Sequence, residues 1–447
     1  MLPTLAAALA GVTALGCGGS SGDEPRAPVV LIVIDTLRAD GLGCYGAGAE
    51  AAPAITRLGA EGAIFRQVLA ASPWTGPSVA SILTGKYPDE VGIHGLRDPL
   101  PIAAATLAER FQAAGFRTGA VVSNPLAGSA YGYDRGYEHF HLGRYKGEPG
   151  GSGRPFFTAD RVTDAALAWL AEIAPDPAPF FLHVHYTDPH EPYLAPARWR
   201  DAALAGGAPL AEELLLDGAF TRAPLTASQL QTLERSYAAE VAFVDHEVGR
   251  LLAALPPDAL VVFTSDHGEE FREHGGFLHG HSLFQELLHV PLIVRGPGVP
   301  AGVVVEAPVS QVDIAPTIVE LARLGRRRAD FAGTSLVPLL QRAAAPGEED
   351  ARPHFSVLEN KGHRVYAVRQ GRWKLHYEPD QRQSILYDLE ADPGERRNLA
   401  REQGDLVSSL VELLRKREAR ILPADTPKDP ELLRRLEEEL RAIGYAR

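Results

Sequence analysis

Cysteine is almost absent from this sequence, which has only Cys17 and Cys44 among its 447 residues. If Cys17 is lipidated, no disulfide can form within the chain, so stability must come from a hydrophobic core. With 45% hydrophobic and 23% charged residues, the composition is globular and sufficient for a large core. The length fits one large domain with a smaller one, or two or three domains.

Runs of basic residues and basic patches interleaved with aromatic residues are also lacking. Together with the formal net charge of −13, this absence argues against a general nucleic-acid binder. A long apolar run is missing as well. The N-terminal stretch Leu5–Leu15 is too short to span a bilayer as a mature helix, but its length is typical of a signal-peptide core.

We therefore expect residues 1–17 to be a signal peptide, followed by a Gly/Ser/acidic linker over 18–27. Small residues lead up to Cys17, so the segment resembles a bacterial lipoprotein signal in which that cysteine becomes the lipidated N-terminus. The expected location is the periplasm or cell envelope. Membrane contact is expected only through the lipid anchor.

After the linker, apolar runs of strand length alternate with helical patterns. The alternation predicts an α/β domain over 28–345, with a large, mostly parallel sheet flanked by helices. The expected strands are 29–34, 118–122, 179–185, 259–264 and 290–294. The expected helices are 104–114, 160–173 and 230–254.

Beyond residue 353 the pattern changes to a period of two. The segments 363–369, 372–377 and 384–387 alternate in this way with turns between them, which predicts a small antiparallel sheet. We place this subdomain over 346–425, including a helix at 404–420. A helical tail over 426–447 is expected to contain a helix at 430–443.

The stretch SPWTGPSVASILTGKYP predicts a short helix that begins at Pro77 and stops at Gly85. Thr75 should then lie just outside the helix N-terminus, where backbone N–H groups favour negative charge. An ordinary helix cap is one interpretation of this threonine. A nucleophile is the other, and the rest of the chain has to decide between them.

Polar residues follow three of the expected strands. Asp35 follows the first strand, Asp266 and His267 follow the strand at 259–264, and His185 and His190 lie at or after the end of a third. Because the carboxyl ends of parallel strands meet at one edge of a sheet, these residues should lie together.

Two aspartates, a histidine and a hydroxyl suit one divalent cation, with calcium, magnesium, manganese and zinc all compatible. The cation and the helix N-terminus would both lower the pKa of the Thr75 hydroxyl, which would make it a usable nucleophile. Protonation of a leaving group needs an acid of near-neutral pKa, and His279 and His281 are the candidates. His289, between Leu288 and Val290, is expected to be structural.

Several motifs together resemble the sulfatase family of the alkaline-phosphatase superfamily. They run in order from about residue 28 to about residue 400 and include LIVIDTLRADGLGCYG, SPWTGPSVASILTGKYP, FLHVHYTDPHEPY, TSDHGEEFREHGGFLHGHSLFQELLHVPLIVRGPG and ILYDLEADPGERRNLA. The resemblance implies a large α/β domain with a smaller antiparallel subdomain. It also implies a metal-dependent hydrolase of sulfate or phosphate esters.

When the family motifs are matched position by position, the resemblance implies that the metal ligands are Asp35, Asp266 and His267. It implies that Thr75 is the nucleophile and that His190 contacts the substrate. Thr36 stands where many sulfatases have a second metal-binding aspartate, so it is a weaker candidate ligand. We also expect His185 and Asn124 to contact the substrate. The expected partner is an anionic ester, either a sulfated or a phosphorylated glycan, lipid or small molecule.

The sequence departs from the family at the nucleophile. The sulfatase signature is C-x-P-x-R or S-x-P-x-R, in which Cys or Ser becomes formylglycine, whereas this chain has T75-G-P-S-V79. No formylglycine is therefore expected. A formylglycine hydrate uses its second hydroxyl to expel sulfate, and threonine has only one oxygen.

A Thr-phosphate, by contrast, can be cleared by in-line attack at phosphorus. Phosphoester or phosphodiester cleavage is thus chemically easier for this chain than sulfate-ester cleavage. A phosphoglycerol- or phosphoethanolamine-type transferase acting on envelope glycans or lipids is an alternative function. A non-catalytic surface lipoprotein of the same fold is another.

Overall fold

The computed structural model describes residues 26–48, 50–143, 157–204, 224–325, 330–342, 352–360 and 363–419, with isolated positions between 210 and 221 and beyond 420. The predicted signal peptide, the anchor at Cys17, most of the linker and most of the C-terminal tail lie outside the described residues. Within the described part of the chain, no helix has the length and apolarity needed to cross a membrane.

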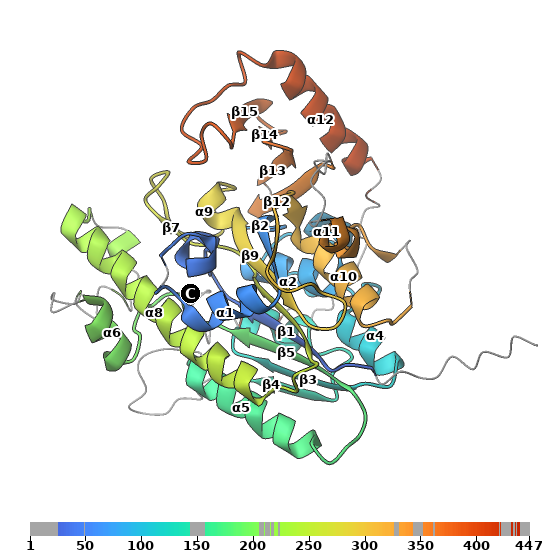
Figure 1. Cartoon of the computed structure of the whole chain (residues 1–447). Helices are drawn as coiled ribbons and strands as arrows, with labels where there is room; N and C mark the ends of the chain where they lie inside the picture. The colour runs from blue at the N-terminus through green and yellow to red at the C-terminus, as the bar shows by residue number, and fades with distance from the viewer. Residues whose placement is uncertain are drawn as a thin grey trace, which may run out of the picture.

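A nine-stranded sheet forms the centre of the molecule, with strand order β10-β2-β9-β6-β1-β5-β3-β4 and β11 paired to β2 (Figure 1). Strands β6, β1, β5, β3 and β4 are all parallel, as the alternating pattern predicts. The strands are β1 Val29–Ile34, β2 Ala63–Leu69, β3 Arg117–Val122, β4 His139–Leu142, β5 Phe180–Tyr186, β6 Leu260–Ser265, β9 His289–Arg295, β10 Val303–Val305 and β11 Val309–Ser310.

The sheet is mostly parallel, as expected, and one of its long strands is antiparallel. β9, predicted at 290–294, runs antiparallel to both of its neighbours, β6 and β2. Antiparallel neighbours do not need a crossover helix. The connection from β6 to β9 accordingly contains only two short strands and one short helix, namely β7 Glu270–Phe271, β8 Phe277–Leu278 and α9 Gln285–Leu288.

Helices cover both faces of the sheet, and each face has its own hydrophobic core. One core packs α2 Thr75–Thr84, α4 Leu107–Ala113, α10 Ile314–Leu321 and α11 Val337–Arg342 against the sheet. The other packs α1 Pro53–Glu61, α5 Ala159–Ile173, α6 Ala197–Leu204 and the long α8 Ala227–Ala254. Three of these four, α1, α5 and α6, contact α8. The short helix α3 Pro88–Val91 follows α2.

The start of α4 differs from the prediction of a helix at 104–114. Thr106 caps this helix, because its hydroxyl accepts a hydrogen bond from the Glu109 backbone N–H at 3.1 Å. The Glu109 carboxylate accepts one in return from the Thr106 N–H at 2.8 Å. This reciprocal capping box fixes the first helical residue at Leu107.

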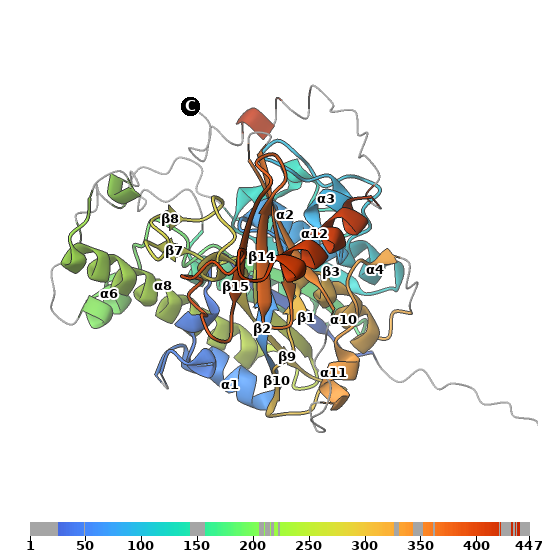
Figure 2. The same cartoon turned by 90° about the horizontal axis from the view of Figure 1, so that it is seen from above.

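A second, four-stranded antiparallel sheet lies at the C-terminal end and is covered by α12 Gly404–Glu418 (Figures 1 and 2). Its strands are β12 His354–Asn360, β13 His363–Gln370, β14 Trp373–Glu378 and β15 Gln383–Asp388. Strands β13 to β15 match the expected segments, whereas β12 was not predicted. This sheet lies within the predicted range of the C-terminal subdomain, although the exact domain boundaries stay predictions.

Candidate active site

The register of the parallel strands brings the predicted residues to one edge of the large sheet. Ile34, the last residue of β1, pairs with Tyr186 of β5 and with Ser265 of β6. Asp35 directly follows β1 and Asp266 directly follows β6 in the sequence, so the two residues lie side by side at the carboxyl edge of the sheet. Sites of open α/β sheets form at this edge.

Thr75 lies inside the first turn of α2, not before it. The helix begins at Thr75 and its N-cap is Trp74, which makes no side-chain cap hydrogen bond. Pro77 is tolerated at the third position because the first N–H groups of a helix have no partner within it. The prediction that the helix begins at Pro77 is thus wrong by two residues, and Thr75 is not the capping residue.

The Thr75 hydroxyl faces the charged cluster at the sheet edge. Thr75 is buried, and its Oγ1 lies 3.4 Å from His267 Nε2 and 3.4 Å from Asn124 Nδ2. Tyr133 helps to hold this turn, because its hydroxyl donates to the Gly76 carbonyl at 2.6 Å. The oxygen is therefore positioned beside the aspartates rather than among packed apolar side chains.

Asp35 and Asp266 are completely buried, and each has one oxygen that accepts no hydrogen bond, Asp35 Oδ1 and Asp266 Oδ2. The other oxygen of Asp266 accepts from the backbone N–H groups of Thr36 at 3.2 Å and of His267 at 2.8 Å. Burial raises the pKa of both carboxyl groups, and the charge of Asp35 raises that of Asp266 further. Two buried carboxylates that repel each other are what a divalent cation would neutralise.

His267 presents an unprotonated nitrogen to these free oxygens. Its Nδ1 lies 2.9 Å from the Gly268 carbonyl, so this nitrogen donates and Nε2 carries the lone pair. Nε2 lies 3.5 Å from Asp35 Oδ1 and 3.6 Å from Asp266 Oδ2. Burial lowers the pKa of His267 well below its usual value, which keeps the ring neutral. A backbone carbonyl that orients the ring in this way is typical of a metal-ligating histidine.

Thr36 contributes to the site through its backbone. Its φ of 55° is in the left-handed region, which is strained for a β-branched residue. This conformation directs its N–H to Asp266, while its carbonyl accepts from the Tyr237 hydroxyl at 2.8 Å. Its own Oγ1 is buried and makes no hydrogen bond, so its predicted role as a ligand stays a prediction.

Asn124 and His185 both lie against the aspartates. Asn124 Nδ2 donates to Asp35 Oδ2 at 2.6 Å, which fixes the orientation of that carboxylate. His185 Nε2 lies 4.0 Å from Asp35 Oδ2 and 3.9 Å from Asp266 Oδ2. Neither of its ring nitrogens makes a hydrogen bond, and burial lowers its pKa well below the usual value. The geometry therefore makes His185 a further candidate metal ligand, a role that the sequence analysis did not give it.

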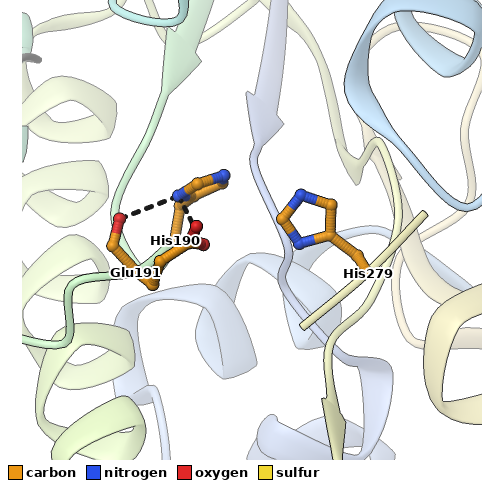
Figure 3. Close-up of side chains that lie close together, drawn as sticks. All are labelled: His190, Glu191 and His279. Carbon is orange, nitrogen blue, oxygen red and sulfur yellow. Dashed lines mark hydrogen bonds and ion pairs between the residues drawn. The ribbon is translucent and has the colours of Figure 1, made fainter. Parts of the chain in front are cut away.

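His190, Glu191 and His279 form a second group of side chains that lie close together (Figure 3). His190 Nδ1 lies 2.8 Å from the Glu191 carbonyl oxygen and 2.9 Å from its carboxylate. Burial would lower the pKa of His190, but Glu191 and the surrounding acids outweigh this effect and raise it well above its usual value. His279 Nδ1 lies 2.9 Å from Glu269 Oε1.

The structure separates the two candidates for a general acid. The His279 ring lies with its centroid 4.5 Å from that of His267, whose own Nε2 is 3.5 Å from Asp35 Oδ1. His281 instead pairs with Glu270 at 2.7 Å and is partly exposed. His289 contacts the Arg66 carbonyl at 2.7 Å, consistent with the expected structural role.

Two acidic residues of the site were missed by the sequence analysis, Glu191 and Glu269. Glu269 is completely buried and receives hydrogen bonds from His279 at 2.9 Å and from the Tyr193 hydroxyl at 2.9 Å. Its place two residues after His267 could have indicated it. Glu191 directly follows His190, but the sequence does not show that its carboxylate turns toward His279.

Buried carboxylates, histidines and a hydroxyl in the first turn of a helix lie together at the carboxyl edge of a mostly parallel sheet, an arrangement that suits an α/β hydrolase of anionic esters. Comparison with known sequences gives the family. A sulfatase family model matches residues 28–324, and a model of the N-sulphoglucosamine sulphohydrolase C-terminal region matches residues 272–420. The chain belongs to the sulfatase family, whose members typically bind a divalent metal.

Curated relatives include the choline-sulfatase of Rhizobium meliloti, which is 31% identical over 50% of this chain and 46% of its own length. That match thus spans about half of the relative. The N-acetylglucosamine-6-O-sulfatase of Bacteroides thetaiotaomicron is 25% identical over 92% of this chain and 90% of its own length.

Solved structures support the fold. A protein in complex with its substrate D-glucosamine-2-N,6-O-disulfate has a TM-score of 0.75 at 23% identity, with 90% of this chain and 99% of that chain covered. The phosphonate monoester hydrolase of Agrobacterium radiobacter has a TM-score of 0.70 at 23% identity, with 91% and 99% covered.

Proposed function

We propose that this chain is a metal-dependent hydrolase of anionic esters in which Thr75 is the nucleophile, with phosphoric esters or diesters preferred over sulfuric esters. The observation that carries the proposal is the position of Thr75 Oγ1, 3.4 Å from His267 Nε2 and beside two buried aspartates. An ordinary threonine cap would have no such neighbours.

The residues present fit one divalent cation. Asp35 Oδ1 and Asp266 Oδ2 are buried without a hydrogen-bond donor, and the lone pair of His267 faces both. We propose that these three residues and Thr75 hold the cation. His185, which lies against both aspartates, is a further ligand of the same ion. When bound, the cation supplies positive charge that acidifies a hydroxyl and stabilises anionic oxygens.

The Thr75 hydroxyl would release its proton to water when the cation binds, and its oxygen would then attack phosphorus while the bond from phosphorus to the leaving oxygen breaks. Asn124 holds the Asp35 carboxylate in place through its 2.6 Å hydrogen bond, so it acts on the reaction through that ligand. His190 and His279 lie next to this cluster, and positive charge held between them, as a proton or as a bound cation, would stabilise the leaving oxygen. Water later attacks the Thr75 phosphoester at phosphorus and releases phosphate or a phosphomonoester.

The loss of the formylglycine signature has a structural counterpart. Val79 stands where the family has arginine. It belongs to α2 and is completely buried in the hydrophobic core between this helix and the sheet. An arginine would need polar partners at this place. This apolar surrounding supports a chemistry that does not use formylglycine.

A panel of chromogenic substrates tests the proposal. Sulfate esters, phosphate monoesters, phosphate diesters and phosphonate monoesters would each be assayed with Ca²⁺, Mg²⁺, Mn²⁺ and Zn²⁺. We expect turnover of a phosphorus ester that requires a divalent ion and the Thr75 hydroxyl. Turnover of sulfate esters alone would overturn the preference for phosphorus, and turnover that survives removal of the hydroxyl would overturn the role of Thr75.

We also propose that the chain is exported and anchored through a lipid on Cys17. The support is the sequence of residues 1–17 and the linker that follows. In a bacterial host, Cys17→Ala should move the protein from the membrane fraction to the soluble fraction without changing its turnover. Equal membrane association of the two forms would contradict the anchor.

A further inference from the structure

We propose that His190, Glu191 and His279 hold a second divalent cation next to the first, so that the active site takes two. Each of the three residues offers one ligand atom, and these atoms all lie within 4.8 Å of one another. Figure 3 shows the Glu191 carboxylate on the side of His190 that faces His279. Two imidazole nitrogens and one carboxylate oxygen are a ligand set that suits Zn²⁺ or Mn²⁺.

The surroundings of His279 orient it as a ligand. Its Nδ1 donates to the Glu269 carboxylate at 2.9 Å, which leaves the lone pair on Nε2. Glu269 is itself fixed by the Tyr193 hydroxyl at 2.9 Å and is completely buried. In many metal sites the ligating histidine donates its other N–H to a carboxylate. This hydrogen bond fixes the orientation of the ring and makes the ligand nitrogen more basic.

Glu191 gives an independent observation. Its Oε2 is buried and accepts no hydrogen bond, although it lies only 2.9 Å from His190 Nδ1. The His190 N–H is instead directed at the Glu191 backbone carbonyl, 2.8 Å away. A buried carboxylate oxygen needs positive charge beside it, and either a protonated His190, 2.9 Å away, or a metal ion would supply that charge.

The second site adjoins the first. The His279 ring centroid lies 4.9 Å from that of His190 and 4.5 Å from that of His267, which belongs to the first site. A backbone hydrogen bond also holds the segment of His279 against the residues that precede α2, because the Gly280 N–H donates to the Pro73 carbonyl at 2.9 Å.

This inference deepens the proposed function and, in its catalytic consequence, rests on it. Bound by His190, Glu191 and His279, a second cation would supply positive charge to the leaving oxygen, while a cation at the first site would acidify the Thr75 hydroxyl. The competing occupant of the second site is a proton, which would make His190 an imidazolium paired with Glu191.

Zinc stoichiometry distinguishes these occupants. The full chain would be depleted of metal, loaded with excess Zn²⁺, freed of unbound ion and measured for zinc per chain. We expect two equivalents for the wild type and one each for Glu191→Gln, His279→Ala and Asp266→Asn. His281→Asn is the matched control, because this histidine lies on the same segment with its own glutamate but outside the cluster. It should retain two.

A wild type that saturates at one equivalent would overturn the second site, as would two equivalents in both Glu191→Gln and His279→Ala. Glu191→Gln preserves the size of the side chain, so it guards against misfolding, which circular dichroism would check. The result also separates the two proposals. If Asp266→Asn retains two equivalents, the first site is wrong, whereas the loss of one equivalent in Glu191→Gln supports the second site in either case.

Discussion

Two buried groups of charged residues differ in how their charges are balanced. At the edge of the large sheet, Asp35 and Asp266 face each other, and none of the described lysines or arginines forms an ion pair with them. Near the C-terminal sheet, the buried Lys374 ammonium lies 2.9 Å from Glu395 Oε1. Gln285 completes this second group, because its backbone N–H donates to Glu395 Oε2 at 2.7 Å and its side-chain oxygen accepts from Lys374 at 3.1 Å.

The pKa shifts of the two groups run in opposite directions. Burial would raise the pKa of Glu395, but Lys374 and His376 outweigh it and lower the value to about 2. Burial and the charge of Asp35 raise the pKa of Asp266. A buried carboxylate beside a buried ammonium is neutralised within the fold, whereas two buried carboxylates that face each other can be neutralised only by a proton or by an added cation. This difference is what marks the sheet edge as the functional site.

The largest expected effect is on catalysis. Thr75→Ala should lower kcat/KM by about a thousandfold or more, because the attacking oxygen is removed. Thr75→Ser preserves the hydroxyl and should stay within about tenfold of the wild type. Steady-state kinetics with the best substrate of the panel would measure both. The melting temperatures should stay close to the wild type, and an active, correctly folded alanine variant would remove Thr75 from the mechanism.

A matched pair of amide substitutions tests the comparison directly. Glu395→Gln leaves the Lys374 ammonium buried without its carboxylate and should lower the free energy of unfolding by about 3 kcal/mol. Denaturant unfolding monitored by circular dichroism would measure the change. A loss below about 0.5 kcal/mol, the range of ordinary surface substitutions, would mean that the pair does not stabilise the fold.

Asp266→Asn should have the opposite effect on the metal-free protein. The substitution removes one of two repelling carboxylates, and its amide can donate to the free Asp35 Oδ1, so stability should rise by about 1 kcal/mol. The same variant should lose most activity and the stabilisation that added divalent ion gives the wild type. Melting temperatures with and without ion would show both effects. A strongly destabilised metal-free variant would indicate that Asp266 is a structural residue like Glu395.

The smallest expected effect is on acid stability. The pKa of Glu395 falls from 4.5 to about 2 on folding, so its contribution is complete above pH 4.5 and is lost as pH falls toward 2. Unfolding free energies measured across this interval should therefore fall with pH more steeply for the wild type than for Glu395→Gln. Parallel curves would contradict the pairing.

The sequence predicted most of the sheet because strands buried on both faces read as continuous apolar runs, as in β1 and β6. The direction of β9 was not predictable in the same way. An apolar run of this kind is the same whether the strand is parallel or antiparallel to its neighbours. β12 was missed although it pairs with β13 along its whole length. Val357 and Leu358 are adjacent, apolar and both buried, so this segment does not keep the period of two that marked the other strands of the sheet.

The metal-ligand candidates were predictable for a different reason. Asp35, Asp266 and His267 directly follow strands, so strand ends alone place them. The role of Asn124 as the hydrogen-bond partner of Asp35 and the turn of Glu191 toward His279 depend on loops. Loop conformation is set by tertiary contacts that spacing does not reveal.

The most direct test of the cation-activated threonine is to trap Thr75 during turnover. The metal-loaded chain would be quenched with acid while it cleaves its best phosphorus ester, then digested and analysed by mass spectrometry. The account predicts a phosphoryl group on Thr75 that disappears when the divalent ion is chelated beforehand. An actively turning-over enzyme whose Thr75 stays unmodified, or whose phosphoryl group lies on another residue, would contradict it.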